Sequence, residues 1–583
     1  MRPFVWILSF ILLSGFVYGI TLKKENPNKD KLLLEIISYV LDRGHFDPKD
    51  INDEFSENVY MSYLENIDGQ HRFFLKSDIN AFNSYRYLID NEIKNTQVEF
   101  FNLSFEKLME RMAQVEGFYK SLLETPFDFS IKDEINLDFK KASYANNLIE
   151  LRAKWRKRLK LNALERFTSK KDEEAQKLKK DVTYVMKTDN ELEEKAREII
   201  SENMDAFFER YNDLNRKNWF SIYINSIVLQ FDPHTSYLAP SEKDRFDASM
   251  SGEFEGIGAR LQKRNQEVKI VEVISGGPVW RDELLEIGDI ILKVAQPNKE
   301  AVDISGMRLD DSIKLIKGPK GTQVILTIKH VDGAIEDVKV TRDVVILEET
   351  YARSSLITND KESFGLIELP KFYINFQDYN QRNAATDVKK ELEQLKQKNV
   401  KGIILDLRNN GGGSLKTVVE MAGYFIKEGP VVQVKSTGGK KEVLKDIDPS
   451  IVWDGPLVIL VNEFSASASE IIAAALQDYK RAIILGSKQT FGKGTVQKLD
   501  NLSSGQIKIT ESKFYRITGA GMQSKGIHPD ITLPSTWDIE EIGESSYDRA
   551  LSWDEVKPIH FTKFPMEQSL ISQLKNEHLL RLD

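Results

Sequence analysis

The stretch that decides the fold is Gly402-Ile-Ile-Leu-Asp-Leu-Arg-Asn-Asn-Gly-Gly-Gly413. A short apolar run bounded by glycine is typical of a buried strand, and the polar and glycine residues after it mark a tight turn. A helical pattern over residues 415–426 follows directly. A buried strand, a glycine turn and a helix in this order indicate a layered α/β structure.

The same alternation continues on both sides of this stretch. The further elements that we predict are a strand over 364–369, a helix over 384–398, a strand over 456–462, a helix over 467–479 and a strand over 482–486. Strands that alternate with helices favour a sheet covered by helices. We therefore expect an α/β core over residues 343–535.

Residues 246–342, just before this core, have a different composition. Glycines and β-branched residues dominate, strand patterns cover 268–274 and 322–328, and only 309–316 is expected to form a helix. Turn signals separate the strands. This part is predicted to be a small β-rich domain.

The remaining parts of the chain are predicted to be helical. Residues 20–245 carry apolar residues at helical spacing, and 151–200 is rich in Lys, Glu, Leu and Ala, which is typical of solvated helices. Residues 536–583 form a short polar tail that is expected to be helical near its end. With 583 residues, several domains are expected, and the predicted fold class is a multidomain α+β protein.

The first residues predict export. Arg2 is followed by an apolar run and then by small residues that end at Gly19, which is the pattern of a signal peptide over residues 1–19. An uncleaved membrane anchor is the alternative, but the apolar run is shorter than the roughly 20 residues that a spanning helix needs. After cleavage we expect no stable transmembrane segment.

Composition and missing motifs exclude several classes of protein. A net charge of -9 argues against a general nucleic-acid binder, which needs a concentrated basic face. The chain has no cysteine, so it has neither disulfides nor thiolate metal sites. The zinc-peptidase pattern His-Glu-x-x-His does not occur. The seven histidines, among them His234 and His528, show no metal-ligand spacing, so we expect structural roles for them and no metal.

The chemistry concentrates in two strings, Asn462-Glu-Phe-Ser-Ala-Ser-Ala-Ser-Glu470 and Thr490-Phe-Gly-Lys-Gly-Thr-Val-Gln497. In the first, Ser467 begins a helix, where free N–H groups and the helix dipole suit an oxyanion hole. In the second, Lys493 and Gln497 point to the same face of a strand, so the glutamine could orient the lysine amine.

Two interpretations of these strings stay open at this point. Ser467 and Lys493 could be a nucleophile and its base, which requires enough burial to keep the amine neutral below its usual pKa of about 10.4. Alternatively, the span from Ser467 to Glu470 is a capping box at a helix start, and Lys493 is an ordinary surface lysine.

Four strings in this order resemble the carboxy-terminal processing peptidases, or tail-specific proteases, in particular their long bacterial periplasmic branch. The similarity extends over most of the chain, and the strings are Phe231-Asp-Pro-His-Thr-Ser-Tyr-Leu, Leu405-Asp-Leu-Arg-Asn-Asn-Gly-Gly-Gly, Ser465-Ala-Ser-Ala-Ser-Glu-Ile and Thr490-Phe-Gly-Lys-Gly-Thr-Val-Gln.

The resemblance assigns roles to residues of the second, third and fourth strings. It implies that Ser467 is the nucleophile, that Lys493 is the general base and that Gln497 supports the lysine. The backbone N–H groups of Ala468 and Gly412 would form the oxyanion hole.

The resemblance also implies the identity of the domains. Residues 246–342 would be a PDZ domain, with the helix 309–316 beside its groove, and residues 343–535 a crotonase-like α/β peptidase core. The loop that binds a peptide carboxylate would be formed by Gly256, Ile257, Gly258 and Ala259. Convergent N–H groups suit a carboxylate, and an extended tail can add to the sheet edge.

The implied function is that of a serine endopeptidase in the periplasm that recognises exported proteins by their free, apolar C-terminal tails. No cofactor and no nucleic acid are expected, and an adaptor protein is a possible partner. Alternatives are a catalytically inactive PDZ scaffold that binds peptides, and a crotonase-type acyl-CoA enzyme, although the glycine turn holds no evident acidic catalytic residue.

The sequence departs from the family pattern in two places. Lys493 lies 26 residues after Ser467, one residue more than is usual, and the extra residue falls within the loop 487–490. Loops absorb single insertions readily, so the pairing of the two residues is still expected. Relatives usually continue with a longer helical region than the residues that lead to Asp583.

Overall fold

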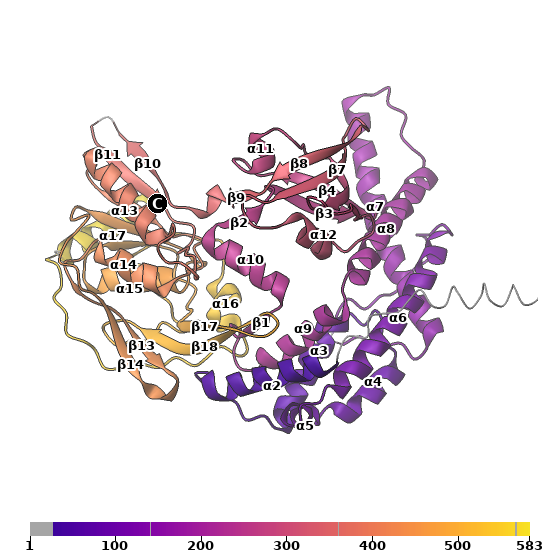
Figure 1. The fold of residues 1–583 in the computed structure, drawn as a ribbon, viewed down its shortest axis with the longest axis horizontal. Helices are drawn as coiled ribbons and strands as arrows, with labels where there is room; N and C mark the ends of the chain where they lie inside the picture. The colour runs from indigo at the N-terminus through magenta and orange to yellow at the C-terminus, as the bar shows by residue number, and fades with distance from the viewer. Residues whose placement is uncertain (1–26, 140, 360, 566–567, 583) are drawn as a thin grey trace, which may run out of the picture.

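The computed structural model describes residues 27–139, 141–359, 361–565 and 568–582. Figure 1 shows the helical part along one side of the molecule, the α/β core on the other and the small β domain across from the core. The predicted signal peptide over residues 1–19 lies outside the described residues. Within the described ranges, no helix is both long and apolar enough to cross a membrane.

In the described part of residues 27–228, eight α-helices share one apolar core around Tyr63, Phe100 and Tyr223. The predicted helical stretch 151–200 is interrupted, because Thr188 starts a new helix by accepting a hydrogen bond from the Glu191 N–H. The helices are α2 (Pro27–Gly44), α3 (Asp53–Asp68), α4 (Lys76–Phe82), α5 (Ile89–Lys94), α6 (Glu99–Leu123), α7 (Leu148–Lys180), α8 (Asp189–Asn212) and α9 (Arg216–Val228).

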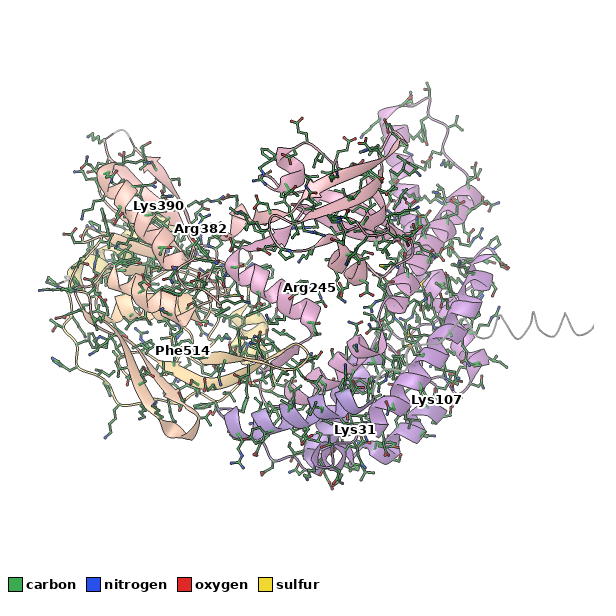
Figure 2. The ribbon with its side chains drawn as sticks, viewed as in Figure 1. Lys31, Lys107, Arg245, Arg382, Lys390 and Phe514 are labelled. Atoms are coloured by element: carbon green, nitrogen blue, oxygen red, sulfur yellow. The ribbon has the colours of Figure 1, made fainter. Side chains whose placement is uncertain are left out.

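A two-stranded ribbon joins the small β domain to the rest of the chain. Helix α10 (Pro240–Ser251) ends at Gly252 in the left-handed region, and β2 (Glu253–Gly256) then pairs antiparallel with β9 (Asp343–Ile346). Arg245 of α10, labelled in Figure 2, lies 3.5 Å from Asp310 of the β domain. The two strands of this ribbon are the covalent connections between the small domain and the rest of the chain.

The small domain is an antiparallel sheet in the order β3-β4-β5-β7-β8, with β6 beside β5. The strand patterns predicted over 268–274 and 322–328 are confirmed, as is the helix over 309–316, and one short further helix is present. The elements are β3 (Ala259–Arg264), β4 (Glu267–Val273), α11 (Pro278–Arg281), β5 (Ile290–Ala295), β6 (Val302–Asp303), α12 (Leu309–Ile316), β7 (Gln323–Lys329) and β8 (Ile335–Thr341).

The α/β core holds a six-stranded sheet in the order β10-β11-β12-β15-β16-β19, parallel except for the antiparallel edge strand β10. Its strands are β10 (Arg353–Thr358), β11 (Ser363–Glu368), β12 (Ile403–Asp406), β15 (Leu457–Val461), β16 (Ile483–Gly486) and β19 (Ile531–Thr532). Three helices, all predicted, belong to this core: α13 (Ala384–Gln397), α14 (Leu415–Gly423) and α15 (Ala468–Asp478).

A second sheet covers the helices from the other side. It has the order β1-β18-β13-β14, and β17 also pairs with β18. Helix α15 is buried almost all round, because it touches β16 of the first sheet and β13 of the second. The strands are β1 (Ser236–Leu238), β13 (Gly429–Ser436), β14 (Lys441–Asp446), β17 (Thr495–Asn501) and β18 (Gln506–Tyr515).

Strand β18 ties the core to the parts that precede and follow it. Strand β1, which was predicted to lie in the helical domain, pairs with β18, and Ile507 and Ile509 of β18 pack into the apolar core of the helices. The predicted tail 536–583 contains α16 (Ile539–Ile542) and α17 (Gln568–Leu582), so it is helical near its end as expected. The predicted limits between the domains stay predictions. The limit between residues 245 and 246 falls inside α10.

Candidate active site

Ser467 stands at a sharp turn between β15 and α15. Its φ and ψ are 55° and -111°, a strained conformation for a residue other than glycine. The neighbouring serines are tied down: the Ser465 hydroxyl donates to Leu407 O at 2.8 Å, and that of Ser469 to Asn410 O at 2.9 Å. Among the described residues, the Ser467 hydroxyl has no hydrogen-bond partner, and it faces a cavity. Of the three serines, it is the one free to react.

Glu470 joins the two strings in which the chemistry was expected. Its buried carboxylate accepts hydrogen bonds from Ser467 N at 2.7 Å, Thr490 Oγ1 at 2.6 Å, Gly492 N at 2.8 Å and Lys493 N at 3.0 Å. Burial raises the pKa of Glu470 to about 7. One half of the capping box is present, because the Glu470 carboxylate accepts a hydrogen bond from Ser467 N at the helix start. The other half is absent, because the Ser467 hydroxyl caps nothing.

The Lys493 amine is held by a glutamine, as predicted, although Lys493 precedes β17 and the pairing of β17 with β18 is irregular between Val496 and Gln497. Lys493 Nζ donates to Gln497 Oε1 at 2.5 Å and to Thr495 O at 3.4 Å. The amide of Gln497 is oriented by its Nε2, which donates to Thr495 Oγ1 at 2.9 Å and to Thr510 Oγ1 at 3.1 Å. Burial, and then the charge of Lys508, lower the pKa of Lys493 to about 8.

One cavity of about 460 Å³ contains both side chains. Ser467 and Lys493 both line it, without a hydrogen bond between them in the described part of the chain. The extra residue of the loop 487–490 is accommodated at the surface, where Lys488 is exposed, while Thr490 is buried against Glu470. Much of the remaining wall is apolar and suits an apolar substrate side chain; it includes Met250, Leu415, Ile471, Val496 and Phe514.

Backbone N–H groups face the cavity from two sides. The N–H of Ala468 lies at the start of α15 and has no acceptor among the described residues. The N–H of Gly412 donates to Asn410 Oδ1 at 2.9 Å, so it is engaged in this conformation, whereas Gly411 and Gly413 line the cavity. Ala468 is thus placed as the sequence predicted, and the predicted use of Gly412 would require the Asn410 amide to turn away.

A histidine and a glutamate of the site lay outside the predicted set. His234, for which we expected a structural role, lines the cavity, and its Nε2 lies 2.7 Å from Glu544 Oε2. Burial lowers the pKa of His234. Glu544 comes from the predicted tail and is itself held by Gln523 Nε2 at 2.7 Å. No pattern in the sequence links positions 234 and 544, although His234 lies within one of the four family strings.

The glycine loop of the small domain presents free N–H groups. In the described structure, the N–H groups of Ile257 and Gly258 have no acceptor, while their carbonyl oxygens accept from Val279 N at 3.1 Å and Ile274 N at 2.8 Å. Gly258 has a φ of 83°, and a Cβ there would lie 3.0 Å from Gly277 Cα. Helix α12 lies beside β3, as a groove requires. The loop can therefore bind an anion at its backbone.

In the described ranges, no three His, Cys, Asp or Glu side chains are grouped so that they could hold a metal ion.

Comparison with known families divides the chain into four parts. Residues 37–241 match the tail specific protease N-terminal domain, 247–329 the PDZ domain, 363–533 peptidase family S41 and 537–583 the C-terminal domain of tail specific protease. The predicted combination of a helical N-terminal region, a PDZ domain and a peptidase core is confirmed.

The individual proteins that are similar to this chain are also named as proteases. The tail-specific protease of Haemophilus influenzae is 32% identical over 558 residues, which cover 93% of this chain and 76% of that protein. A probable CtpA-like serine protease of Staphylococcus epidermidis is 35% identical over 306 residues, or 52% of this chain and 58% of that protein. The solved PDZ domain of a carboxy-terminal protease from Vibrio cholerae, in complex with a peptide, is 39% identical and covers 16% of this chain and 97% of that one, with a TM-score of 0.16.

Proposed function

Because the chain belongs to the tail-specific protease family of S41 peptidases, it is a serine peptidase, and we propose that Ser467 and Lys493 are its catalytic dyad. One observation carries this assignment. The single unbonded hydroxyl of residues 465–469 shares a cavity with a lysine amine whose pKa is lowered to about 8 and whose direction is set by Gln497.

The hydrogen bonds of Lys493 leave room for its function as a base. A neutral amine has two N–H donors and one lone pair, and the donors are used by Gln497 Oε1 and Thr495 O. The lone pair then accepts the proton of Ser467 Oγ as this oxygen bonds to the carbonyl carbon of the substrate. The protonated amine next gives its proton to the leaving amine as the peptide bond breaks, and water hydrolyses the acyl-enzyme.

The negative charge that develops on the carbonyl oxygen needs donors in place before the reaction. We assign one donor to the N–H of Ala468, where the dipole of α15 adds a positive field. The second donor comes from the turn 411–413, which reaches the same cavity through Gly411 and Gly413. Its residues are fixed by Asn410, whose Nδ2 donates to Leu369 O at 2.7 Å.

Substrate selection is proposed to start at the PDZ domain. The free N–H groups of Ile257 and Gly258 suit the terminal carboxylate of a protein, which supports this proposal together with the match to the PDZ domain family. The apolar wall of the catalytic cavity favours apolar residues in the tail. Movement about the β2–β9 ribbon, near Gly252 and Arg342, would bring the bound tail to Ser467.

The cellular setting is proposed from the sequence. The predicted signal peptide over residues 1–19 suits export to the periplasm, where the substrates would be exported proteins. An adaptor protein that delivers substrates remains a proposal of the same kind. N-terminal sequencing of the protein from the cell envelope tests export, and a start at Met1 in the cytoplasm would contradict it.

The dyad and the tail recognition can be tested together. A protein with a free apolar C-terminus, and the same protein with an amidated one, are offered to the wild type, to Lys493→Ala and to the surface control Lys498→Ala. We expect the wild type and the control to cut the free form faster, and Lys493→Ala to cut neither. Cleavage by Lys493→Ala at the wild-type rate would refute the dyad; equal cleavage of both forms would refute tail recognition.

A further inference from the structure

A second lysine lines the catalytic cavity and has no part in the mechanism above. Lys508 lies on β18, opposite Leu499 of β17 on one side and Ser236 of β1 on the other. Side chains two apart on a strand share a face, so Lys508 lies next to Thr510, whose hydroxyl holds Gln497. The Lys508 amine therefore stands on the same wall as the group that orients Lys493.

Lys508 has no partner of its own. Among the described residues, the amine of the Lys508 side chain forms neither a hydrogen bond nor an ion pair. The negative charge of Asp232 acts on the Lys508 amine, but the Asp232 carboxylate is already hydrogen-bonded to other side chains. Oδ1 of Asp232 accepts from Thr510 Oγ1 at 2.9 Å, and Oδ2 lies 2.7 Å from His45 Nε2 and accepts from Thr235 Oγ1 at 2.5 Å. A half-buried lysine without a partner is costly and calls for a reason.

We propose that Lys508 is a positioning residue whose positive charge opposes protonation of the Lys493 amine, so that the base is more readily available to accept the serine proton. This inference rests on the proposed dyad. Two ammonium groups in one cavity repel each other strongly because little water screens them. One amine of the pair therefore loses its proton at a lower pH than a lone lysine would, and the surroundings decide which one.

The surroundings favour the proton on Lys508. The negative charge of Asp232 acts on both amines, but Lys493 is the more deeply buried of the two and therefore loses its proton more readily. Burial lowers the pKa of both lysines, and the charge of Lys508 lowers the pKa of Lys493 further.

The other charged groups around Lys493 are committed to partners. Glu544 and Asp232 favour its charged form, but Glu544 is bound to His234 and Gln523. Glu470 also favours the charge, yet its pKa of about 7 leaves it partly neutral near neutral pH. Lys508 is thus the one neighbour among those acting on Lys493 that opposes its protonation.

The test is the pH profile of kcat/KM on a peptide tail without groups that titrate between pH 6 and 10. Lys508→Met keeps the length of the side chain and removes the charge. The acid limb is expected to move up by about one pH unit, with roughly a tenfold loss at pH 7 that disappears above about pH 9.5. Lys508→Arg keeps the charge and should keep the limb. Lys498→Met is the matched control, because Lys498 lies on the neighbouring strand, pairs with Asp500 and stays outside the cavity.

Each other outcome has a defined meaning. An unmoved limb in Lys508→Met, with Lys493→Ala inactive, overturns the role of Lys508 and leaves the dyad intact. A loss of the same size at every pH also overturns it, since that is the pattern of lost packing, and so does a displaced limb in Lys508→Arg. Full activity of Lys493→Ala would instead overturn the proposed function itself.

Discussion

We propose related tasks for two glycine turns that differ in how tightly they are held. The turn 410–413 lies against Ser467, and the loop 256–259 belongs to the PDZ domain. Each contains a glycine with positive φ, 99° at Gly412 and 83° at Gly258, which allows a tight turn of the backbone. In the proposed function, both turns stabilise negative charge on an oxygen.

Their surroundings separate the two turns. A Cβ on Gly412 would lie 2.8 Å from both Ala466 O and Ser467 Cβ, so the turn is locked against the helix start that carries the nucleophile. The PDZ domain instead rests on the helical part through polar contacts, such as Lys263 to Asp213 at 2.6 Å. Stabilisation of a transition state needs hydrogen-bond donors in fixed positions. The proposed tail recognition instead belongs to the PDZ domain, which a few polar contacts hold against the helical part.

The largest effect should follow from disturbing the locked turn. Gly412→Ala adds a Cβ that cannot be accommodated without moving Ser467, and at positive φ it is strained in any case. We expect kcat to fall by roughly 10²–10³-fold, the scale of losing an oxyanion donor, with little change in tail binding. Steady-state kinetics beside fluorescence binding of a tail peptide measures both. Gly411→Ala, where a Cβ meets open space, should lose much less; equal losses would show that the turn is not locked.

The next largest effect is expected on the acid side of the pH profile of kcat/KM. Because burial lowers the pKa of Lys493 to about 8, the amine is protonated and inactive below that pH and free to act above it. We expect kcat/KM to rise by about tenfold per unit from pH 6 and to level off above pH 8. Tail binding should stay flat over this range, because a terminal carboxylate is already ionised. A profile that falls from pH 6 to 9 would contradict Lys493 as the base.

A smaller effect is expected from the PDZ loop. Gly258→Ala places a Cβ 3.0 Å from Gly277 Cα and should shift the loop, raising KM for free tails by about tenfold while kcat stays within twofold. Gly276→Ala is the control, because its glycine also has positive φ but its Cβ meets open space. If kcat falls as much as in Gly412→Ala, the division between the two turns is wrong.

The smallest effect should come from loosening the contact under the PDZ domain. Lys263→Met removes the pair with Asp213, and Glu209 loses a charged neighbour. Hydrogen–deuterium exchange should become faster in β2 and β9 while the core strands keep their protection. Cleavage of a short peptide should change by less than about twofold. Faster exchange within β12 or β15 would show instead that the contact stabilises the core.

Much of the architecture could be predicted because its periodicity is local. Residues 402–413 carry a buried strand and its turn within twelve positions, and the helix 309–316 was predicted to the residue. Strand β18 was not predicted, since its buried side chains include Thr510 and Lys513, which look solvent-exposed in a sequence and become buried by pairing with Asp232 and Asp554.

The proposed catalytic pair could be named from the sequence, but its surroundings could not. Ser467 and Lys493 stand in short strings, and a contact between Lys493 and Gln497 was expected from their spacing. His234 and Lys508 line the cavity, and Glu544 contacts His234, only because β1 pairs with β18 and the C-terminal segment returns to the core. Such contacts over long sequence distances leave no periodic signal.

The most direct measurement is the mass of the covalent adduct that a serine-reactive phosphonate probe forms with the enzyme. Peptide mapping should place the probe on Ser467 in the wild type, with labelling at least about 10²-fold slower in Lys493→Ala, because the base no longer takes the proton. Ser465 and Ser469 should stay unlabelled, since their hydroxyls are buried in hydrogen bonds. An adduct on another residue, or equal labelling rates in the two proteins, would contradict the account.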